Sequence, residues 1–287
     1  MSIEGVADSE VDRVIRAGLA EDLADGPDVT SLATIPEDHR SQLDLVAREP
    51  GVVAGLDVAR RVFETVGPTD VTLHTRDGRA ITAGEVLLSA QGPTRDLLTA
   101  ERTALNLLTH LSGIATATAR WVEVLGPAGP RVRDTRKTLP GLRALQKYAV
   151  RCGGGVNHRM SLSDAALIKD NHVVAAGGVA AAFRAVREQF PGIAVEVEVD
   201  SLEQLEEVLE AGADLVLLDN FTVEQMRQAV ELTGGRARLE ASGGLTFANA
   251  AEVATTGVDY VAVGALTHSV KVLDIGADLR EVPDADA

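Results

Sequence analysis

From about residue 131 onward, short apolar runs alternate with amphipathic ones. The runs at 193–200 and 213–220 are rich in Val and Leu and are typical of buried strands. A stretch with helical periodicity follows each run and begins at Ser201 or Thr222, residue types that cap helix N-termini. The pattern predicts six strands joined by single helices, hence a parallel sheet covered on both faces. Their number favours an α/β barrel over an open sheet, which the pattern alone leaves open.

The first part of the chain shows a different pattern. Residues 10–24 form an amphipathic helix with four apolar side chains on one face, namely Val11, Val14, Ile15 and Leu19. Strand-like runs with turn dipeptides follow, and then a long apolar helical stretch at 94–125 with Gly113 as a candidate break. We therefore expect an N-terminal α+β sandwich domain, a barrel domain and a C-terminal tail that packs on the first domain, at residues 1–112, 113–267 and 268–287.

Composition restricts the kind of protein. Hydrophobic residues make up 45% of the 287 and aromatic residues only 3%, so we expect a large core of aliphatic side chains. No apolar run approaches the roughly 20 residues that span a bilayer, and the acidic N-terminus lacks the regions of a signal peptide. The single cysteine, Cys152, excludes an internal disulfide. We expect a cytoplasmic protein without membrane contact.

Charge is distributed unevenly along the chain. The formal net charge is -16, which argues against nucleic-acid binding because that requires a basic surface. Residues 131–172 nevertheless carry nine Arg or Lys and only three Asp. This clustering predicts a small ligand with several negative charges. Arg143, Lys147 and Arg151 repeat every four residues on a predicted helix at 140–152, where they face either that ligand or an acidic partner subunit.

Polar residues stand at the carboxyl ends of the predicted strands, where parallel α/β folds bind ligands. Glu196 and Glu198 alternate within one strand and need cations if they are buried, and Lys169 is the nearest candidate by topology. The Ser-Gly-Gly turn that begins at Ser242 can hold a phosphate through backbone N–H groups. The strand-end candidates are Arg136, Lys137, Lys169, Asp170, Glu196, Glu198, Asp219, Ser242, Gly243, Gly244 and Gly264.

Other chemistries fit parts of this pattern. Lys169 could be the Schiff-base lysine of a class I aldolase, although the surplus of arginines argues against it. A non-enzymatic anion-binding protein would have the basic cleft but has no need for the two glutamates of the 193–200 strand. Zinc chemistry is disfavoured, because the six histidines show no ligand spacing and Cys152 stands alone.

Longer motifs carry a resemblance to a known family. The block "DTRKTLPGLR…QKYAVRCGGGVNHRMSLSDAALIKDNH", with "VEVEVDSL", "GADLVLLDNF", "LEASGG" and "VDYVAVGALTHSV", resembles the quinolinate phosphoribosyltransferases. Near the N-terminus, "EDLADGPDVTSLATIP" and "ERTALNLLTHLSGIAT" are similar to that family too, so the resemblance spans nearly the whole chain. A family of molybdenum-associated proteins shares the fold and some of these motifs. It stays an alternative, as does a nicotinate-specific transferase.

The resemblance implies a fold, an activity and an assembly. The fold is an incomplete, seven-stranded α/β barrel that follows the α+β domain. The activity transfers phosphoribosyl from phosphoribosyl pyrophosphate to quinolinate with decarboxylation, giving nicotinate mononucleotide, pyrophosphate and CO2 in NAD biosynthesis, with Mg²⁺ as cofactor. The assembly is a homodimer with shared active sites, or a hexamer made of three such dimers.

The resemblance also implies which residues bind quinolinate. Arg136, Arg159 and Arg102 are assigned to its carboxylates, because planar guanidinium groups pair with carboxylates through two hydrogen bonds. His158 is expected to assist them. Arg102 is expected to come from the partner subunit, so each active site would be shared.

The remaining transferred positions concern the phosphoribosyl donor. Lys137 and Lys169 are expected to hold charge that develops between the two substrates. Glu198 and Asp219 are expected to act through the ribose hydroxyls and through Mg²⁺, directly or by way of water. These four residues are the predicted catalytic ones. Backbone N–H groups are expected to bind the 5′-phosphate at Ser242, Gly243, Gly244 and Gly264.

Overall fold

The computed structural model describes residues 3–282. The chain forms two compact units, which are described separately. The sheet unit contains residues 1–117, 138–154 and 269–287, and the barrel unit contains residues 118–137 and 155–268. The segment 138–154, at the centre of the basic block, therefore belongs to the sheet unit, although segments of the barrel unit flank it on both sides in the sequence.

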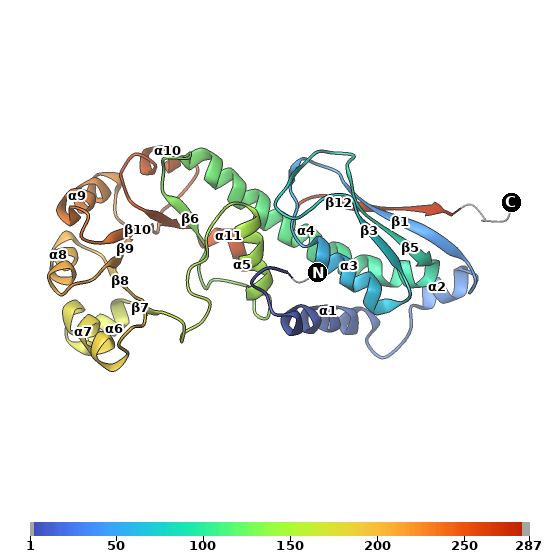
Figure 1. Cartoon of the computed structure of the whole chain (residues 1–287), viewed down its shortest axis with the longest axis horizontal. Helices are drawn as coiled ribbons and strands as arrows, with labels where there is room; N and C mark the ends of the chain where they lie inside the picture. Colours follow the sequence, from blue (N-terminus) through green and yellow to red (C-terminus); the bar gives the residue numbers. More distant parts are fainter. Residues whose placement is uncertain (1–2, 283–287) are drawn as a thin grey trace. The chain divides into compact units, whose positions relative to one another are not determined.

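A four-stranded antiparallel sheet forms the centre of the sheet unit (Figure 1). The C-terminal strand β12 (Ile275–Glu281) pairs with β1 (Arg40–Ala47), and β1 also pairs with β5 (Val86–Pro93), so that Leu45 lies opposite both Ala277 and Leu88. The C-terminal strand thus completes a sheet that begins in the N-terminal part of the chain. In spatial order the strands are β12 (Ile275–Glu281), β1 (Arg40–Ala47), β5 (Val86–Pro93) and β3 (Asp70–Leu73), and a separate pair joins β2 (Gly51–Val52) and β4 (Ala80–Ile81).

Local sequence explains the shorter helices of this unit, which are α1 (Asp8–Leu23), α2 (Val29–Thr34), α3 (Leu56–Val66) and α5 (Arg143–Cys152). The Asp28 carboxylate accepts hydrogen bonds from the backbone N–H groups of Thr30 and Ser31, which fixes the start of α2. Helix α3 contacts β3 and β5. The amphipathic pattern of the first helix is confirmed, because α1 buries the four side chains predicted for one face, Val11, Val14, Ile15 and Leu19.

Helix α4 (Thr94–Leu125) runs through 32 residues without a break at Gly113, so the expected interruption was wrong. Glycine is needed there for another reason. A Cβ atom at Gly113 would lie 2.4 Å from the carbonyl oxygen of Lys271. The missing side chain lets the C-terminal segment cross the helix in contact with its backbone. Within residues 3–282, no helix combines the length and apolar character that crossing a membrane requires.

The barrel unit is built on a parallel sheet with helices on its outer side (Figure 1). Its strands are buried aliphatic runs, and side chains such as Val197, Val216 and Val261 are fully inaccessible to solvent. In spatial order the strands are β6 (Arg131–Arg133), β11 (Tyr260–Ala262), β10 (Arg238–Ser242), β9 (Leu215–Asp219), β8 (Val195–Val199) and β7 (Ala166–Ile168). The helices are α6 (Asp170–Ala176), α7 (Val179–Gln189), α8 (Leu202–Glu210), α9 (Val223–Thr233), α10 (Ala250–Val253) and α11 (Ala265–His268).

The two predicted helix caps in the barrel unit are confirmed. The Ser201 hydroxyl accepts the backbone N–H of Gln204 and begins α8. Thr222 and Gln225 exchange hydrogen bonds between side chain and backbone, which forms a capping box at the start of α9. Both helices therefore start directly after the strand ends that line the site described below.

The barrel is incomplete, as expected, but the described residues form six strands rather than the seven that were expected. Beyond β6 the sheet continues only through a single bridge between Arg133 and Val156, and the ring stays open between Val156 and β7. Side-chain hydrogen bonds replace the missing ladder. Asp134, buried at the end of β6, accepts the backbone N–H of His158 at 2.9 Å and also the amide of Asn157.

Candidate active site

A cavity of about 560 Å³ lies at the carboxyl ends of the barrel strands. This is the position that parallel α/β folds use for ligands. Nine of the twelve predicted site residues line it: Arg136, Lys137, His158, Arg159, Lys169, Glu198, Asp219, Ser242 and Gly243. The structure therefore brings together side chains from five separate strand ends and from the open part of the ring.

Four cationic side chains, Arg136, Lys137, Arg159 and Lys169, border this cavity, and we call them the mouth cations. The loop after β6 presents the first two. Its backbone is held by the Thr267 hydroxyl, which donates to the Lys137 carbonyl oxygen at 2.8 Å, and by the Lys137 N–H, which donates to Thr135 Oγ1 at 3.0 Å. One hydrogen bond within the loop and one from α11 therefore hold its backbone.

Two arginines in the mouth lie close enough to influence one another. Burial, and then the positive charge of Arg136, lower the pKa of Arg159. Arg159 donates one guanidinium hydrogen bond to the Ala165 carbonyl oxygen at 2.9 Å, and the buried Nε of Arg136 has no hydrogen-bond partner among residues 3–282. A bound anion would offset the repulsion between the two guanidinium groups. It would also accept a hydrogen bond from the buried Arg136 Nε.

The expected partner of an inward-facing glutamate is confirmed for Glu198. Its carboxylate lies 3.2 Å from the Lys169 ammonium group, which stands at the end of the neighbouring strand β7. Because the Lys169 side chain is 48% exposed, this pair contributes little to stability, within about 1 kcal/mol. It instead places a positive and a negative group side by side at the cavity edge.

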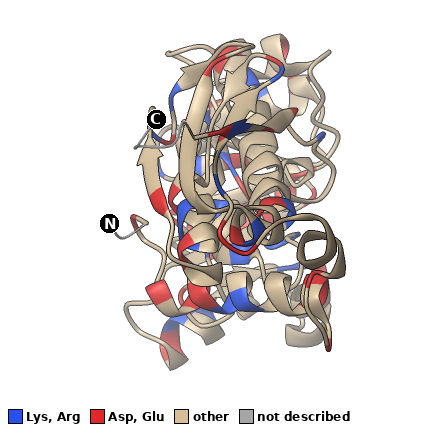
Figure 2. Cartoon of the chain, turned by 90° about the vertical axis from the view of Figure 1, so that its right-hand side faces the viewer, with Lys and Arg blue, Asp and Glu red and all other residues tan. Residues whose placement is uncertain are grey.

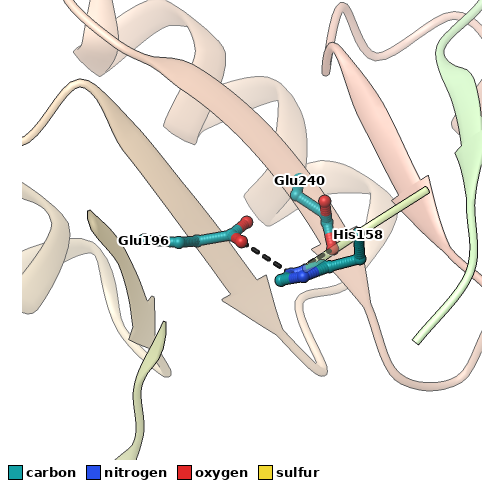
Figure 3. A group of neighbouring side chains, drawn as sticks. All are labelled: His158, Glu196 and Glu240. Carbon is teal, nitrogen blue, oxygen red and sulfur yellow. Dashed lines mark ion pairs between the residues drawn. The ribbon is translucent and has the colours of Figure 1, made fainter. Parts of the chain in front are cut away.

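Below the mouth lies a group of ionisable side chains that we call the floor cluster, consisting of Arg133, His158, Glu196 and Glu240. Figure 3 shows the last three of these side chains. His158 Nε2 lies 2.7 Å from a Glu196 oxygen and 3.8 Å from a Glu240 oxygen. Arg133 contacts Glu240 directly and lies 3.7 Å from Glu196. Glu196 and Glu240 come two residues before Glu198 and Ser242, so they occupy the next inward position along their strands.

The hydrogen bonds of His158 define which ring nitrogen carries the proton. The backbone N–H of Arg159 donates to His158 Nδ1 at 2.7 Å, so Nδ1 is an acceptor. The proton is then on Nε2, which faces Glu196. His158 lines the cavity as expected, but both of its ring nitrogens face groups of the protein.

The floor cluster also resembles a metal site in its composition. Ligand atoms of His158, Glu196 and Glu240 all lie within 4.8 Å of one another. However, the Arg133 guanidinium already contacts both carboxylates and supplies the compensating charge. Burial, and then the charge of Glu196, raise the pKa of Glu240 to about 8, while Arg133 opposes this rise. We therefore interpret the cluster as a group of polar side chains held together around the Arg133 guanidinium, in which Glu240 keeps its proton up to about pH 8.

Carboxylates suited to a divalent cation lie at the edge of the cavity instead. Glu198 and Asp219 also line a smaller adjoining hollow of about 210 Å³, together with Asp170 and Asp200. Carboxylate oxygens, with substrate oxygens and water, are the ligands that Mg²⁺ prefers. The donor set therefore fits Mg²⁺, with Glu198 and Asp219 as the residues that both hollows share.

Position 243, in the turn after β10, requires glycine because Asn220, which directly follows β9, lies against it. Gly243 has a φ of +81°, and a Cβ atom there would lie 2.2 Å from the side-chain oxygen of Asn220. Asn220 itself lines the cavity and donates to Asp219 and to the Ser242 carbonyl oxygen, each at 2.8 Å. Sequence reasoning missed Asn220, although an Asn directly after a strand-end Asp was a visible signal.

Glu240 was missed as well. It follows the same alternation in "RLEAS" that singled out Glu196 and Glu198 in "VEVEVD", so the signal was present in the sequence. Three predicted residues do not line the cavity. Gly244 and Gly264 are adjacent, since Gly244 follows Gly243 and a Cβ on Gly264 would lie 3.1 Å from the Lys137 side chain. Arg102 is exposed on α4 in the sheet unit.

The basic residues of the predicted 140–152 helix have structural roles within the sheet unit. Lys147 is completely buried, so the expectation that it faces a ligand or a partner subunit was wrong. Arg143 donates to the Thr138 hydroxyl at 3.0 Å, and Arg151 donates to the Glu4 carbonyl oxygen. Part of the local positive charge therefore belongs to this unit's own packing and not to the cavity.

An open α/β barrel with cations, carboxylates and a glycine turn around one cavity defines a site for an anionic, phosphorylated substrate. Residues 114–278 match the family model described as "Quinolinate phosphoribosyl transferase, C-terminal domain", and residues 28–112 match that of the N-terminal domain. The chain belongs to the quinolinate phosphoribosyl transferase family.

Individual relatives agree with the family models. The chain is 56% identical over 271 residues to a nicotinate-nucleotide pyrophosphorylase [carboxylating] of Mycobacterium leprae, covering 92% of this chain and 95% of that protein. Its fold is similar to a nicotinate-nucleotide pyrophosphorylase from Francisella tularensis (TM-score 0.93, 39% identity, 98% and 99% coverage). It is also similar to NadC from Streptococcus pyogenes (TM-score 0.92, 42% identity, 96% and 99% coverage).

Proposed function

We propose that this protein transfers the phosphoribosyl group of phosphoribosyl pyrophosphate to quinolinate, with decarboxylation, in NAD biosynthesis. The products are nicotinate mononucleotide, pyrophosphate and CO2. The observation that carries the proposal is the convergence of Arg136, Arg159 and Lys169 on one cavity whose other walls hold Asp219 and the Ser242 turn. This arrangement offers separate places for a diacid and for a sugar phosphate.

The arginine side of the mouth suits quinolinate. Two adjacent carboxylates of the substrate can pair with the neighbouring guanidinium groups of Arg136 and Arg159, and the buried Arg136 Nε gains a partner. His158 supports this side through Arg159, whose backbone N–H it accepts. Nicotinate lacks the 2-carboxylate and would leave these donors unpaired, so we expect it to be a poor substrate.

The opposite side of the cavity suits the phosphoribosyl donor. The Ser242-Gly243-Gly244 turn and Gly264 can bring backbone N–H groups close to the 5′-phosphate. Glu198 and Asp219 face the place where the ribose hydroxyls would lie. Lys137 and Lys169 stand between the two halves of the cavity, where they balance the charges of the pyrophosphate and of quinolinate.

We assign Mg²⁺ to Glu198 and Asp219, because their carboxylates line both hollows and suit this ion directly or through water. When bound, Mg²⁺ supplies positive charge to the pyrophosphate leaving group. The ion pair between Lys169 and Glu198 holds the Glu198 carboxylate at the edge of the cavity.

The residues of the cavity act by positioning and by charge. As pyrophosphate leaves C1 of the ribose, the carbon acquires oxocarbenium character, and Glu198 and Asp219 stabilise this positive charge. Arg136 and Arg159 hold the pyridine nitrogen of quinolinate against C1. The new N–C bond makes the ring cationic, so the ring accepts the electron pair of the C2–carboxylate bond as CO2 departs. A proton then replaces CO2 at C2, and no side-chain nucleophile is required.

We further propose a homodimer with shared active sites, or a hexamer made of three such dimers. Arg102 matches the family motif yet is exposed on α4 and does not line the cavity of its own chain. The proposal assigns Arg102 of the partner subunit to quinolinate. We place the reaction in the cytoplasm, which agrees with a chain whose only cysteine, Cys152, is free.

One assay tests the proposed function. Purified protein is given quinolinate labelled in the 2-carboxylate, and release of labelled CO2 is measured with and without phosphoribosyl pyrophosphate and Mg²⁺. We expect release only when both are present, and little turnover with nicotinate. CO2 release at the same rate without phosphoribosyl pyrophosphate would refute the proposal. An aldolase reaction needs a desolvated lysine nucleophile, whereas Lys169 is half-exposed and paired with Glu198.

A further inference from the structure

We propose that Asn220 is a positioning residue that holds the Asp219 carboxylate and the Ser242-Gly243 turn as one rigid group. In this way it determines how tightly the phosphoribosyl donor is bound. The inference rests on the proposed function for the identity of that donor. It concerns a residue outside the twelve site residues that the sequence predicted.

The backbone of Asn220 is the first observation. Its φ is +57°, and among residues 3–282 only Ala24 shares a positive φ without being glycine. Asn adopts this left-handed conformation more readily than other residues with a side chain. Such conformations persist when the surrounding contacts require them, and they are frequent at functional sites. Here the left-handed turn comes directly after Asp219, the last residue of β9.

Hydrogen bonds on two sides are the second observation. The Asn220 side-chain NH2 donates to Asp219 Oδ2 at 2.8 Å. The Asn220 backbone N–H donates to the Ser242 carbonyl oxygen at 2.8 Å, one step beyond the register pair of Asp219 and Ser242. The residue therefore ties the end of β9 to the end of β10. The amide uses one acceptor position of Oδ2 and leaves Oδ1 of Asp219 without a contact to Asn220.

The close approach of Gly243 is the third observation. A Cβ atom at Gly243 would lie 2.2 Å from Asn220 Oδ1 and 2.7 Å from its Cγ. The planar amide thus packs directly on the glycine backbone. A side chain at position 243 would push the amide away from Asp219, and movement of the amide would release the turn. One planar group therefore sets the spacing between a carboxylate and a phosphate-binding turn.

Two variants separate positioning from general structural damage. Asn220→Gly keeps the left-handed backbone accessible but removes the amide. Asn220→Asp keeps the shape and replaces the NH2 donor by an oxygen that repels Asp219. We expect each variant to raise the KM for phosphoribosyl pyrophosphate by about tenfold or more, since a hydrogen bond to a charged group is lost.

Quinolinate binding distinguishes the two explanations, because general structural damage would weaken it as well. Its Kd, measured by calorimetry, should change less than about twofold in both variants, because Arg136 and Arg159 lie on other elements. Ala24→Gly changes the other non-glycine residue with a positive φ in the described part of the chain, which lies in the sheet unit, and serves as the matched control. Equal losses for both substrates, or an unchanged KM for phosphoribosyl pyrophosphate, would overturn the inference.

A double-mutant cycle gives a second, independent test. Gly243→Ala should damage donor binding strongly in the wild-type background, because its methyl group meets the Asn220 amide. In the Asn220→Gly background the clash with the amide is absent and only the strain of Ala at a φ of +81° remains, so the same change should have a smaller effect. Strictly additive effects of the two substitutions would contradict a shared positioning role.

The wild-type protein distinguishes failure of this inference from failure of the proposed function. If the wild type does not release CO2 from quinolinate, the proposed function is wrong. The positioning role is then decided by a crystal structure of Asn220→Gly. Displacement of the Asp219 carboxylate together with the 242–243 backbone would support it, and an unchanged arrangement would refute it.

Discussion

The floor cluster and the mouth cations lie in the same barrel, but their charges are neutralised in different ways. In the floor, Arg133 and His158 contact Glu196 and Glu240, so each buried charge faces a partner from the protein. In the mouth, one ion pair joins Lys169 to Glu198, and the remaining cations surround a cavity. The floor cluster therefore stabilises the folded barrel, whereas the mouth cations are available to bind a ligand.

The sheet unit shows a third arrangement, in which surface charges of both signs are mixed. Figure 2 shows acidic and basic residues interspersed over the helices and strands of the chain. Arg13 pairs with Glu10 at 2.9 Å, and Arg61 pairs with Asp8 at 2.5 Å, all on or near α1. An exposed pair such as Arg13–Glu10 contributes about 0–1 kcal/mol. The surplus of cations around one cavity therefore stands out against an otherwise mixed distribution.

The largest expected effect concerns the mouth. Arg136→Ala and Arg159→Ala should each reduce quinolinate turnover by at least about a hundredfold, because each removes a positioned donor for a substrate carboxylate. Steady-state release of CO2 measures the loss. Arg227→Ala is the matched control, since this arginine forms only an exposed pair with Glu224 on α9. Turnover within a few-fold of wild type in either mouth variant would show that the arginines do not bind quinolinate.

The next effect tests whether one mouth is completed by two chains. Arg102→Ala and Lys169→Ala should each be inactive alone. When the two are mixed and allowed to exchange subunits, about one site in four should regain both residues and be active, as expected for random pairing in a symmetric dimer. Exchange can be followed by mass spectrometry of the intact dimers. No recovery despite complete exchange would place Arg102 and Lys169 in the site of a single chain.

The free energy of unfolding should depend more on the floor cluster than on the mouth. Glu240→Ala leaves Arg133 buried with one carboxylate fewer, and we expect a loss of about 3–5 kcal/mol in the free energy of unfolding. Glu198→Ala removes the partner of a half-exposed lysine and should lose less than about 1 kcal/mol. Urea denaturation followed by circular dichroism measures both. Equal losses of unfolding free energy in the two variants would contradict a greater structural role for the floor cluster.

The smallest effect is a pH dependence that originates in the floor. Burial and Glu196 raise the pKa of Glu240 to about 8, above its ordinary value, so the native state holds its proton more tightly than the unfolded state. The stability contribution of this group is complete at acidic pH and is lost as the pH rises toward and through about 8. In Glu240→Gln, which carries no titratable group there, this decrease should be smaller. Thermal unfolding between pH 5 and pH 9 measures the difference, and parallel curves would contradict it.

Much of the fold could be predicted from the sequence because its signals are local. Alternating apolar runs and helix caps at Ser201 and Thr222 identified the barrel strands and the starts of two helices. Glu196 and Glu198 could be recognised as inward-facing because side chains alternate along a strand. The position of Lys169 beside Glu198 followed from the order of the strands.

Other features depend on which distant segments pack together, and no local pattern reports that. The apolar stretch around Gly113 continues as one helix because the backbone near Lys271 covers the glycine. The described residues form six strands, and at the open side of the ring the Asp134 carboxylate accepts the backbone N–H of His158, a long-range contact that no local pattern reports. Lys147 lies on an amphipathic helix whose pattern predicted exposure, yet the sheet unit surrounds it completely.

The α/β class, the strand-end residues and the concentration of positive charge could be read from the order of residues, since periodicity and composition are properties of the chain alone. Only the tertiary structure decided how that charge is used. It placed Lys147 in the sheet unit, Arg133 in the floor cluster and Arg136 and Arg159 around the cavity. The physical reason is that the effect of a charge depends on its solvent exposure and on its partners, and both arise from contacts between residues far apart in the chain.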